Sequence, residues 1–319
     1  MQSIIKDYLL KEVPKKRGLL TIEWFAVAYI AFTCILILIF NSRIHNAGGM
    51  LLLRGSSLFL LCLGYFIYQK YTIRLALMLR VGFQISLLTF WYPDLYEISR
   101  IFPNLDHVFA SLEQSVFGCQ PAILFSEKCP SPLLSECFHM GYFFYFPMVA
   151  TVLAYYYFAK HDCFEKAGTI ILGSFFVYYI VFLFLPVAGP QYYFNVIGMD
   201  SAAAGNFPAV GHWFDSDTTL MDTPGWRGGI FYKLMTFVHQ SERPVASFPS
   251  SHVGVSVIMM ILAFKTRSKW LISVLMPLWI LLVCATVYIR AHYVVDVIAG
   301  FLTAPLVYWM LNKFIKGRC

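Results

Sequence analysis

The sequence predicts an all-α integral membrane protein with about eight transmembrane helices. Its 319 residues are 59% hydrophobic and only 13% charged. A soluble domain carries about a quarter charged residues, so this chain cannot cover itself with a polar surface in water. Apolar runs also recur along the chain, and each is close to the ~20 residues that cross a ~30 Å hydrocarbon core.

Eight apolar segments are the predicted spans. They cover residues 22–40, 50–69, 75–92, 134–158, 167–187, 249–264, 270–289 and 291–311. The sixth is short, as expected if His252 lies just inside the membrane edge beside water. We therefore divide the chain into residues 1–70, an N-terminal interfacial segment with two spans, and residues 71–319, a membrane domain with the other six.

The first twenty residues do not have the pattern of a cleavable signal, because no short apolar region with a small-residue cleavage site follows the basic part. Apolar side chains are interspersed with lysines in this segment: Ile4, Ile5, Tyr8, Leu9 and Val13 against Lys6, Lys11 and Lys15. This pattern predicts a short helix at the membrane interface. A frayed basic tail that only sets the topology is the alternative.

The distribution of lysine and arginine predicts the orientation. With the N-terminus in the cytoplasm, the inside segments hold fifteen of these residues and the outside segments eight, spread over much more chain. Cytoplasmic loops carry the excess of positive charge. We therefore expect a multi-pass protein with both termini cytoplasmic and with His252 and His292 on the extracytoplasmic face.

Two long segments on the predicted outer side interrupt the apolar runs. Within residues 93–132, apolar side chains recur at helical spacing over residues 107–117, which predicts an amphipathic helix on the outer leaflet near the entrance for lipid. Residues 188–248 are rich in glycine, proline, aromatics and aspartate, without an obvious helix. A loop of that length is rarely inert, and we expect it to form a lid.

Two polar motifs border the last apolar segments. Arg290-Ala-His-Tyr-Val-Val-Asp296 places His292 and Asp296 four residues apart at the start of a helical run, so they are predicted to share one helix face. An imidazole supported by an aspartate is a nucleophile of fixed tautomer. Arg243-Pro-Val-Ala-Ser-Phe-Pro-Ser-Ser-His252 ends where another apolar run begins, so free backbone N–H groups there can hold an anion.

These motifs resemble those of the type 2 phosphatidic acid phosphatase superfamily. Phe248-Pro-Ser-Ser-His252 is similar to its second signature, Pro-Ser-Gly-His in the common form, and the segment from Ile289 to Gly300 is similar to its third, whose His and Asp match His292 and Asp296. The resemblance covers roughly residues 75–312. It implies that the last six spans form the helical core of that superfamily.

The chain departs from the family pattern in two places. Ala285 and Thr286 stand where the third signature usually has Ser-Arg, and Arg290 lies one helical turn further on. The uncharged segment 188–194 occupies the region of the basic first signature. Both departures are closer to the branch that contains the inositol phosphorylceramide synthases, which transfer phospho-headgroups between lipids.

The residue types predict phosphoryl transfer. A phosphate ester repels anionic nucleophiles, so its charge must first be neutralised. The predicted phosphate ligands are the guanidinium groups of Arg243 and Arg290 and the N–H groups around Ser250 and Ser251. His292 is the predicted nucleophile, which forms a phosphohistidine, and Asp296 holds the proton on its other nitrogen. His252 protonates the leaving oxygen and then activates the acceptor.

The expected partners are a lipid phosphate substrate and the bilayer, with no nucleic acid, no metal and no other cofactor. An ion pair with Glu242 or an aspartate is the alternative role for Arg243. Hydrolysis by water and transfer to a lipid hydroxyl both remain open. A transporter with a buried His292–Asp296–Arg290 relay and a vanadium haloperoxidase are the competing classes. A disulfide between Cys119 and Cys129 is a further possibility on the outer face, where disulfides persist, whereas Cys163 and Cys319 are expected on the reducing side.

Overall fold

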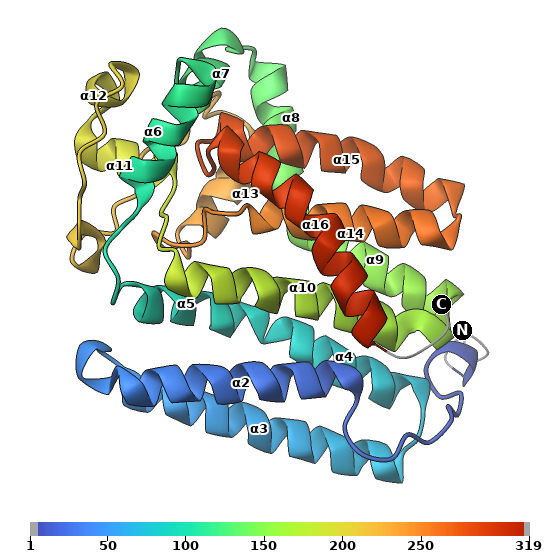
Figure 1. The fold of residues 1–319 in the computed structure, drawn as a ribbon. Helices are drawn as coiled ribbons and strands as arrows, with labels where there is room; N and C mark the ends of the chain where they lie inside the picture. Colours follow the sequence, from blue (N-terminus) through green and yellow to red (C-terminus); the bar gives the residue numbers. More distant parts are fainter. Residues whose placement is uncertain (1–5, 316–319) are drawn as a thin grey trace.

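The computed structural model describes residues 6–315, and this part of the chain is helical without a β-strand. The α-helices are α2 (Thr21–Ile39), α3 (Ala47–Lys70), α4 (Arg74–Ser86), α5 (Leu88–Ser99), α6 (Asp106–Phe117), α7 (Pro121–Lys128), α8 (Pro132–Phe143), α9 (Tyr145–Ala159), α10 (Phe164–Phe184), α11 (Pro190–Ile197), α12 (Met199–Ala203), α13 (Ile230–His239), α14 (Ser251–Thr266), α15 (Lys269–Tyr288) and α16 (Val294–Phe314). The described chain begins and ends at one end of the bundle, and α11 and α12 lie at the other (Figure 1).

Six helices, or helix pairs in line, are long and apolar enough to cross a membrane among the described residues. A further pair, α8 and α9, is bent by 51°, and α14 is apolar but shorter than a full span. Each predicted apolar segment therefore coincides with helix, although the count of eight spans stays a prediction. The predicted N-terminal interfacial helix includes residues 1–5, which lie outside the described part of the chain, so it stays a prediction.

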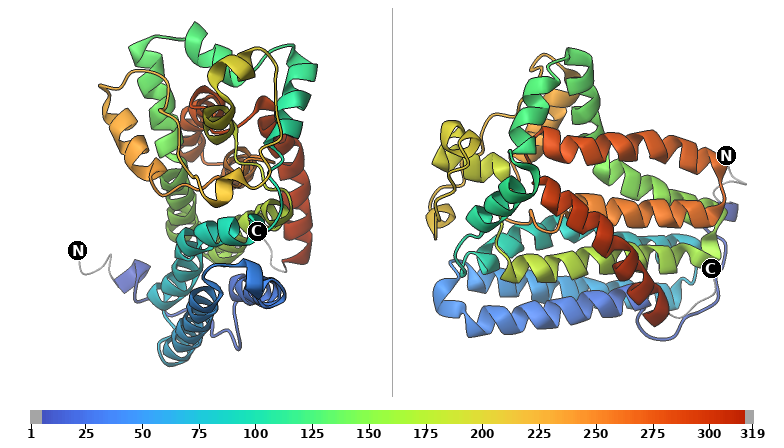
Figure 2. Two further views of the ribbon diagram at one scale, coloured as in Figure 1. Left: turned by 90° about the vertical axis from the view of Figure 1, so that its left-hand side faces the viewer. Right: turned by 45° about the horizontal axis from the view of Figure 1, so that its top comes forward.

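Helix α10 lies at the centre of the membrane bundle. It is the most enclosed of the candidate spans, because it contacts α2, α5, α14 and α16; 78% of its most apolar stretch is buried. Close packing of α14 and α16 depends on Gly300, where a Cβ atom would lie 2.7 Å from the carbonyl oxygen of Ser250. Helices α14 (orange) and α16 (red) cross each other (Figure 2), and the glycine lets their backbones approach closely.

The N-terminal helices carry two buried ion pairs. Arg54 donates to Asp94 at 2.6 Å, and Arg80 donates to the two carboxylate oxygens of Glu23 from Nε and Nη2. Charged groups inside a bilayer persist when they are paired. Helix α5 continues through Pro93, where the sequence predicts a loop, although proline removes one backbone hydrogen bond.

The two long segments are more helical than the sequence predicts. The amphipathic helix is confirmed as α6, whereas the interpretation of residues 188–248 as a loop without helices is wrong, because α11, α12 and α13 form there. These three helices are at most ten residues long. Because these helices are short and are separated by glycines and prolines, the spacing of their apolar residues shows no clear helical period in the sequence.

The cysteines also differ from the prediction. Cys119 and Cys129 are both free, so the disulfide considered for them does not form in this structure. Cys163, which the charge distribution places on the reducing side, is instead disulfide-bonded.

Candidate active site

The His292 side chain lies in the turn between α15 and α16, not on a helix. Helix α15 ends at Tyr288, Arg290 adopts a left-handed conformation with φ of 66°, and α16 begins at Val294. The prediction that His292 and Asp296 share a helix face is therefore wrong in its geometry. The two still meet, because Asp296 turns back over the helix N-terminus, accepts from the N–H of Tyr293 at 2.9 Å and lies 3.6 Å from Nδ1 of His292.

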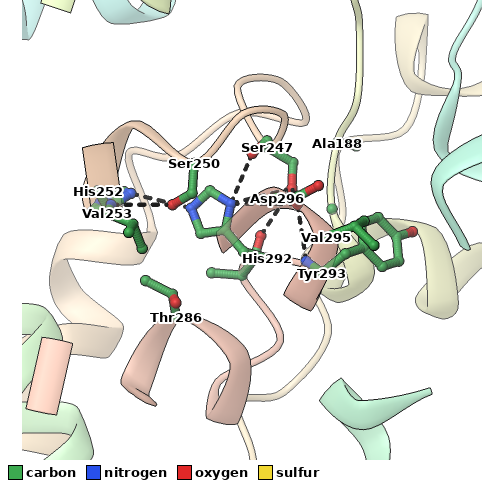
Figure 3. A network of polar contacts seen from close by, with 12 residues as sticks. Ala188, Ser247, Ser250, His252, Val253, Thr286, His292, Tyr293, Val295 and Asp296 are labelled. Atoms are coloured by element: carbon green, nitrogen blue, oxygen red, sulfur yellow. Dashed lines mark hydrogen bonds and ion pairs between the residues drawn. The ribbon is translucent and has the colours of Figure 1, made fainter. Parts of the chain in front are cut away.

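Ser247 completes the support of His292 (Figure 3). Its carbonyl oxygen lies 2.9 Å from Nδ1 of His292, and its hydroxyl donates to Oδ2 of Asp296 at 2.6 Å. Since a carbonyl oxygen only accepts, Nδ1 carries the proton and Nε2 presents its lone pair. The sequence pattern does not single out Ser247, although this residue lies inside the Arg243–His252 motif.

His252 faces His292 from the start of α14. Its Nδ1 lies 3.3 Å from Nε2 of His292, and its ring packs against Tyr142 and Tyr145 at 4.8 and 4.5 Å between centroids. The stacked ring of Tyr142 and the tilted ring of Tyr145 fix the orientation of the His252 imidazole. The nucleophilic nitrogen and a proton-transfer group therefore border the same small space.

The Ser250–Ser251 turn is anchored to the histidine loop. Ser250 is the N-cap of α14: its hydroxyl accepts from the N–H of Val253 at 3.3 Å, and its own N–H donates to the carbonyl oxygen of Asp296 at 3.0 Å. The Ser250 side chain is thus engaged in capping. Ser251 and His252 supply the first-turn N–H groups, which a helix leaves without internal partners and which attract anions.

The two predicted phosphate-binding arginines are placed differently. Arg243 lines the cavity that contains both histidines, whereas Arg290 points to α7, where it donates to the hydroxyl of Ser126 at 3.2 Å. The left-handed turn at Arg290 is the cause, because α15 has already ended and Arg290 no longer continues the helix face of Thr286. The structure therefore brings together His292, Asp296, His252, Ser251 and Arg243 and leaves Arg290 outside that cavity.

An acidic side chain lies in the same cavity. Glu242 accepts from the hydroxyl of Tyr142 at 3.0 Å and from the amide of Gln191 at 3.1 Å. A second, larger cavity of about 250 Å³ adjoins this one and shares Glu242 and Arg243 with it. Its other lining residues include several with hydroxyl, amide and carboxylate groups: Tyr192, Thr218, Asp222, Thr223, Tyr232, Thr236 and Gln240.

The uncharged segment 188–194 supports the site through its backbone. Gly189 has φ of +94°, and a Cβ atom there would lie 2.5 Å from the carbonyl oxygen of Ala291. The N–H of Gln191 donates to the carbonyl oxygen of Arg290 at 2.8 Å. This segment therefore lies directly against the turn that carries His292, and glycine is needed at position 189 for both its conformation and the close approach.

Two buried carboxyl groups of α6 hold the same turn from the other side. Asp106 accepts from the N–H groups of Ala188 and Gly189 at 2.6 and 2.8 Å and from the hydroxyl of Tyr293 at 3.0 Å. Glu113 accepts from the N–H of Val295 at 3.1 Å, in the first turn of α16. No sequence pattern signals either role, because the contacts with α16 and its N-cap join residues more than 180 positions apart.

Burial shifts the protonation of both carboxyl groups. It raises the pKa of Asp106 to about 6, against the hydrogen bonds from Asn104 and the backbone, which lower it. Burial, together with the nearby charge of Asp296, raises the pKa of Glu113 to about 8. Glu113 is therefore mostly neutral at pH 7, which avoids a second negative charge beside Asp296.

The fold and the site together define a multi-pass helical membrane protein in which two histidines, 40 positions apart in the chain, border a small cavity, and a buried aspartate lies behind one of them. Residues 109–310 match the family model PAP2_3, described as the PAP2 superfamily, and the chain belongs to that superfamily. Comparisons with curated proteins and with solved structures gave no significant match.

Proposed function

We propose that the protein is a membrane-embedded lipid phosphatase or phosphotransferase that acts through a phosphohistidine on His292. Membership of the PAP2 superfamily supports a phosphatase or phosphotransferase type of function. The observation that carries the proposal is the orientation of His292: its Nδ1 donates to Ser247, and its Nε2 faces His252 across 3.3 Å. An imidazole held in this tautomer is ready for attack on phosphorus.

The proposed reaction has two steps. Nε2 of His292 attacks phosphorus, the phosphorus–oxygen bond to the lipid breaks, and His252 gives its proton to the leaving oxygen. His252 then takes a proton from water or from a second hydroxyl group, which attacks the phosphohistidine and breaks the phosphorus–nitrogen bond. Arg243 and the N–H groups of Ser251 and His252 neutralise the phosphoryl oxygens, and Asp296 stabilises the positive charge on His292.

Transfer of a headgroup between lipids, as in the inositol phosphorylceramide synthases, is the second candidate function. The polar cavity next to the site favours it, because its hydroxyl, amide and carboxylate groups match a headgroup that carries several hydroxyls. A transporter relay has less support. Arg290 contacts Ser126 rather than Asp296, so the three residues required for such a relay do not form one chain of contacts.

The reaction is tested with the purified protein in phosphatidylcholine vesicles. With dioleoyl phosphatidic acid, we expect release of inorganic phosphate that the His292→Ala variant does not catalyse. In a parallel assay, phosphatidylinositol and ceramide are supplied together, and the lipids are separated by mass. Headgroup transfer without phosphate release would select the second candidate. If neither inorganic phosphate nor a new headgroup lipid forms and phosphate enters the vesicles, both enzymatic candidates are wrong and transport is favoured.

We also propose that the site faces the extracytoplasmic side. The surplus of lysine and arginine on the other side supports this orientation. With the background cysteines replaced, a cysteine at Ser216 should react with an impermeant thiol reagent in intact cells, and one at Ser268 should react only after lysis. The reverse pattern would place the site in the cytoplasm.

A further inference from the structure

A third cavity lies far from the histidines, in the groove between α3 and α4 and against the start of α2. It has a volume of about 240 Å³, and its walls are mainly aliphatic, with Leu60, Leu61 and Ile67 from α3 and Leu75 and Leu79 from α4. Tyr71 and Ile73, from the connection between α3 and α4, also line the groove. This connection lies at the end of the bundle where the described chain begins (Figure 1). The matched family region begins at residue 109, so the groove lies outside it.

Buried polar atoms without partners line this apolar groove. Gln84 is 1% exposed, and in the described structure neither its amide nitrogen nor its amide oxygen has a hydrogen-bond partner. Nη1 of Arg80 is likewise buried without a hydrogen-bond partner among the described residues, although its Nε donates to Glu23 at 2.7 Å. An unsatisfied buried polar group costs about 1–3 kcal/mol. Three such atoms in one groove therefore indicate a polar ligand.

The charges of the groove select a neutral ligand. Glu23 pairs with Arg80 through both of its carboxylate oxygens, so the guanidinium charge is already balanced and a phosphate is not required. The amide of Gln84 offers one donor and one acceptor side, and Arg80 adds a donor. The complementary ligand carries an acceptor oxygen and an O–H or N–H donor, and the aliphatic walls accommodate its alkyl chain.

We propose that this groove is a binding site for a neutral lipid alcohol or lipid amide, whose polar end contacts Gln84 and Arg80 and whose chain lies between α3 and α4. Lipid that only surrounds a membrane protein needs no such polar contact, since hydrocarbon tails pack equally well against aliphatic walls. The site is independent of the catalytic function proposed above, because none of its residues lines the cavity of the histidines.

The experiment uses the full-length protein in phosphatidylcholine vesicles and a dioleoylglycerol analogue with a diazirine in one acyl chain. After illumination, we expect cross-linked peptides from the groove-lining parts of α3 and α4. Unlabelled dioleoylglycerol should compete, and methyl oleate, which has an acceptor carbonyl but no donor, should compete much less. Gln84→Leu removes about two hydrogen bonds, so we expect roughly tenfold weaker labelling.

Two glycines of α3 give a matched pair of variants. Gly64 lines the groove, and a Cβ atom there would lie 3.8 Å from Cγ of Arg80, in ordinary contact, so Gly64→Leu should fill the groove and abolish labelling without disturbing the backbone. Gly55 faces open space with nothing within 4 Å, so Gly55→Leu should label normally.

Three outcomes would overturn the proposal: unchanged labelling in both Gln84→Leu and Gly64→Leu, equal competition by methyl oleate, or labelling spread evenly over the outer surface of the bundle. If Gln84→Leu fails to fold, Gly64→Leu and the competition series still decide. Phosphate release should persist in Gly64→Leu, so a loss of lipid binding is distinguished from a failure of the proposed catalytic function.

Discussion

Replacing His292 by alanine should abolish turnover and leave the protein folded. The side chain is 3% exposed, but its contacts are polar ones to Ser247, Asp296 and His252, so its loss removes chemistry more than packing. Loss of a covalent nucleophile typically lowers kcat by about 10⁴-fold or more. The measurement is phosphate release from dioleoyl phosphatidic acid, with the melting temperature of the purified variant as the check on folding.

The matched control is His212→Ala. That histidine lies outside the site, half-exposed beside Asp215, and its loss should leave the rate within about twofold. Brief reaction with substrate labelled on phosphorus should leave an acid-labile, alkali-stable phosphoryl group on the peptide that contains His292. Near-normal turnover in His292→Ala, or label on another residue, would contradict the assignment.

Arg243→Ala should lower kcat/KM by about 10²–10³-fold, because Arg243 is the arginine that lines the cavity of the histidines and is placed to neutralise phosphoryl oxygens. Arg243→Lys should recover part of the loss, since lysine keeps the charge but not the planar fork. Both are measured as full kinetic series, so that a change in KM is separated from a change in kcat.

Arg290→Ala is the comparison that the structure offers. Its guanidinium contacts Ser126 and the sulfur of Met221, so its loss should lower the melting temperature and leave kcat/KM within about threefold. If Arg290→Ala instead costs as much catalysis as Arg243→Ala, the sequence-based assignment of Arg290 to the phosphate is right. The Arg290 side chain must then turn into the cavity when substrate binds.

The sequence predicts the helical class and marks the two histidine motifs, because both depend on residues that are close together in the chain. Apolar runs report helices that face hydrocarbon, and motif spacing reports residues close together in the chain. The same reasoning failed at Arg290 for a local cause. It assumed that the helix continues past Tyr288, whereas the chain adopts a left-handed conformation at residue 290.

The remaining part of the site was beyond sequence reasoning because it is non-local. Asp106 meets Tyr293 across 187 positions, and Glu113 meets Val295 across 182. A lone aspartate or glutamate on an amphipathic helix is usually solvated, and nothing in the sequence distinguishes these two. Glu242 was weighed only as an ion-pair partner of Arg243. Its carboxylate contacts Tyr142 and Gln191, whereas Arg243 donates to its backbone carbonyl oxygen at 2.9 Å.

The hydrogen bonds that Asp106 and Glu113 accept from the start of α16 have a consequence for biosynthesis. Membrane proteins are made from the N-terminus, and α6 emerges long before α16 does. Until α16 is in place, His292 has no Asp296, and the two carboxyl groups of α6 have no partners there. The nascent chain therefore carries His252 and Arg243 before the residues that support His292 exist, and the proposed active site is complete only when the final helix docks.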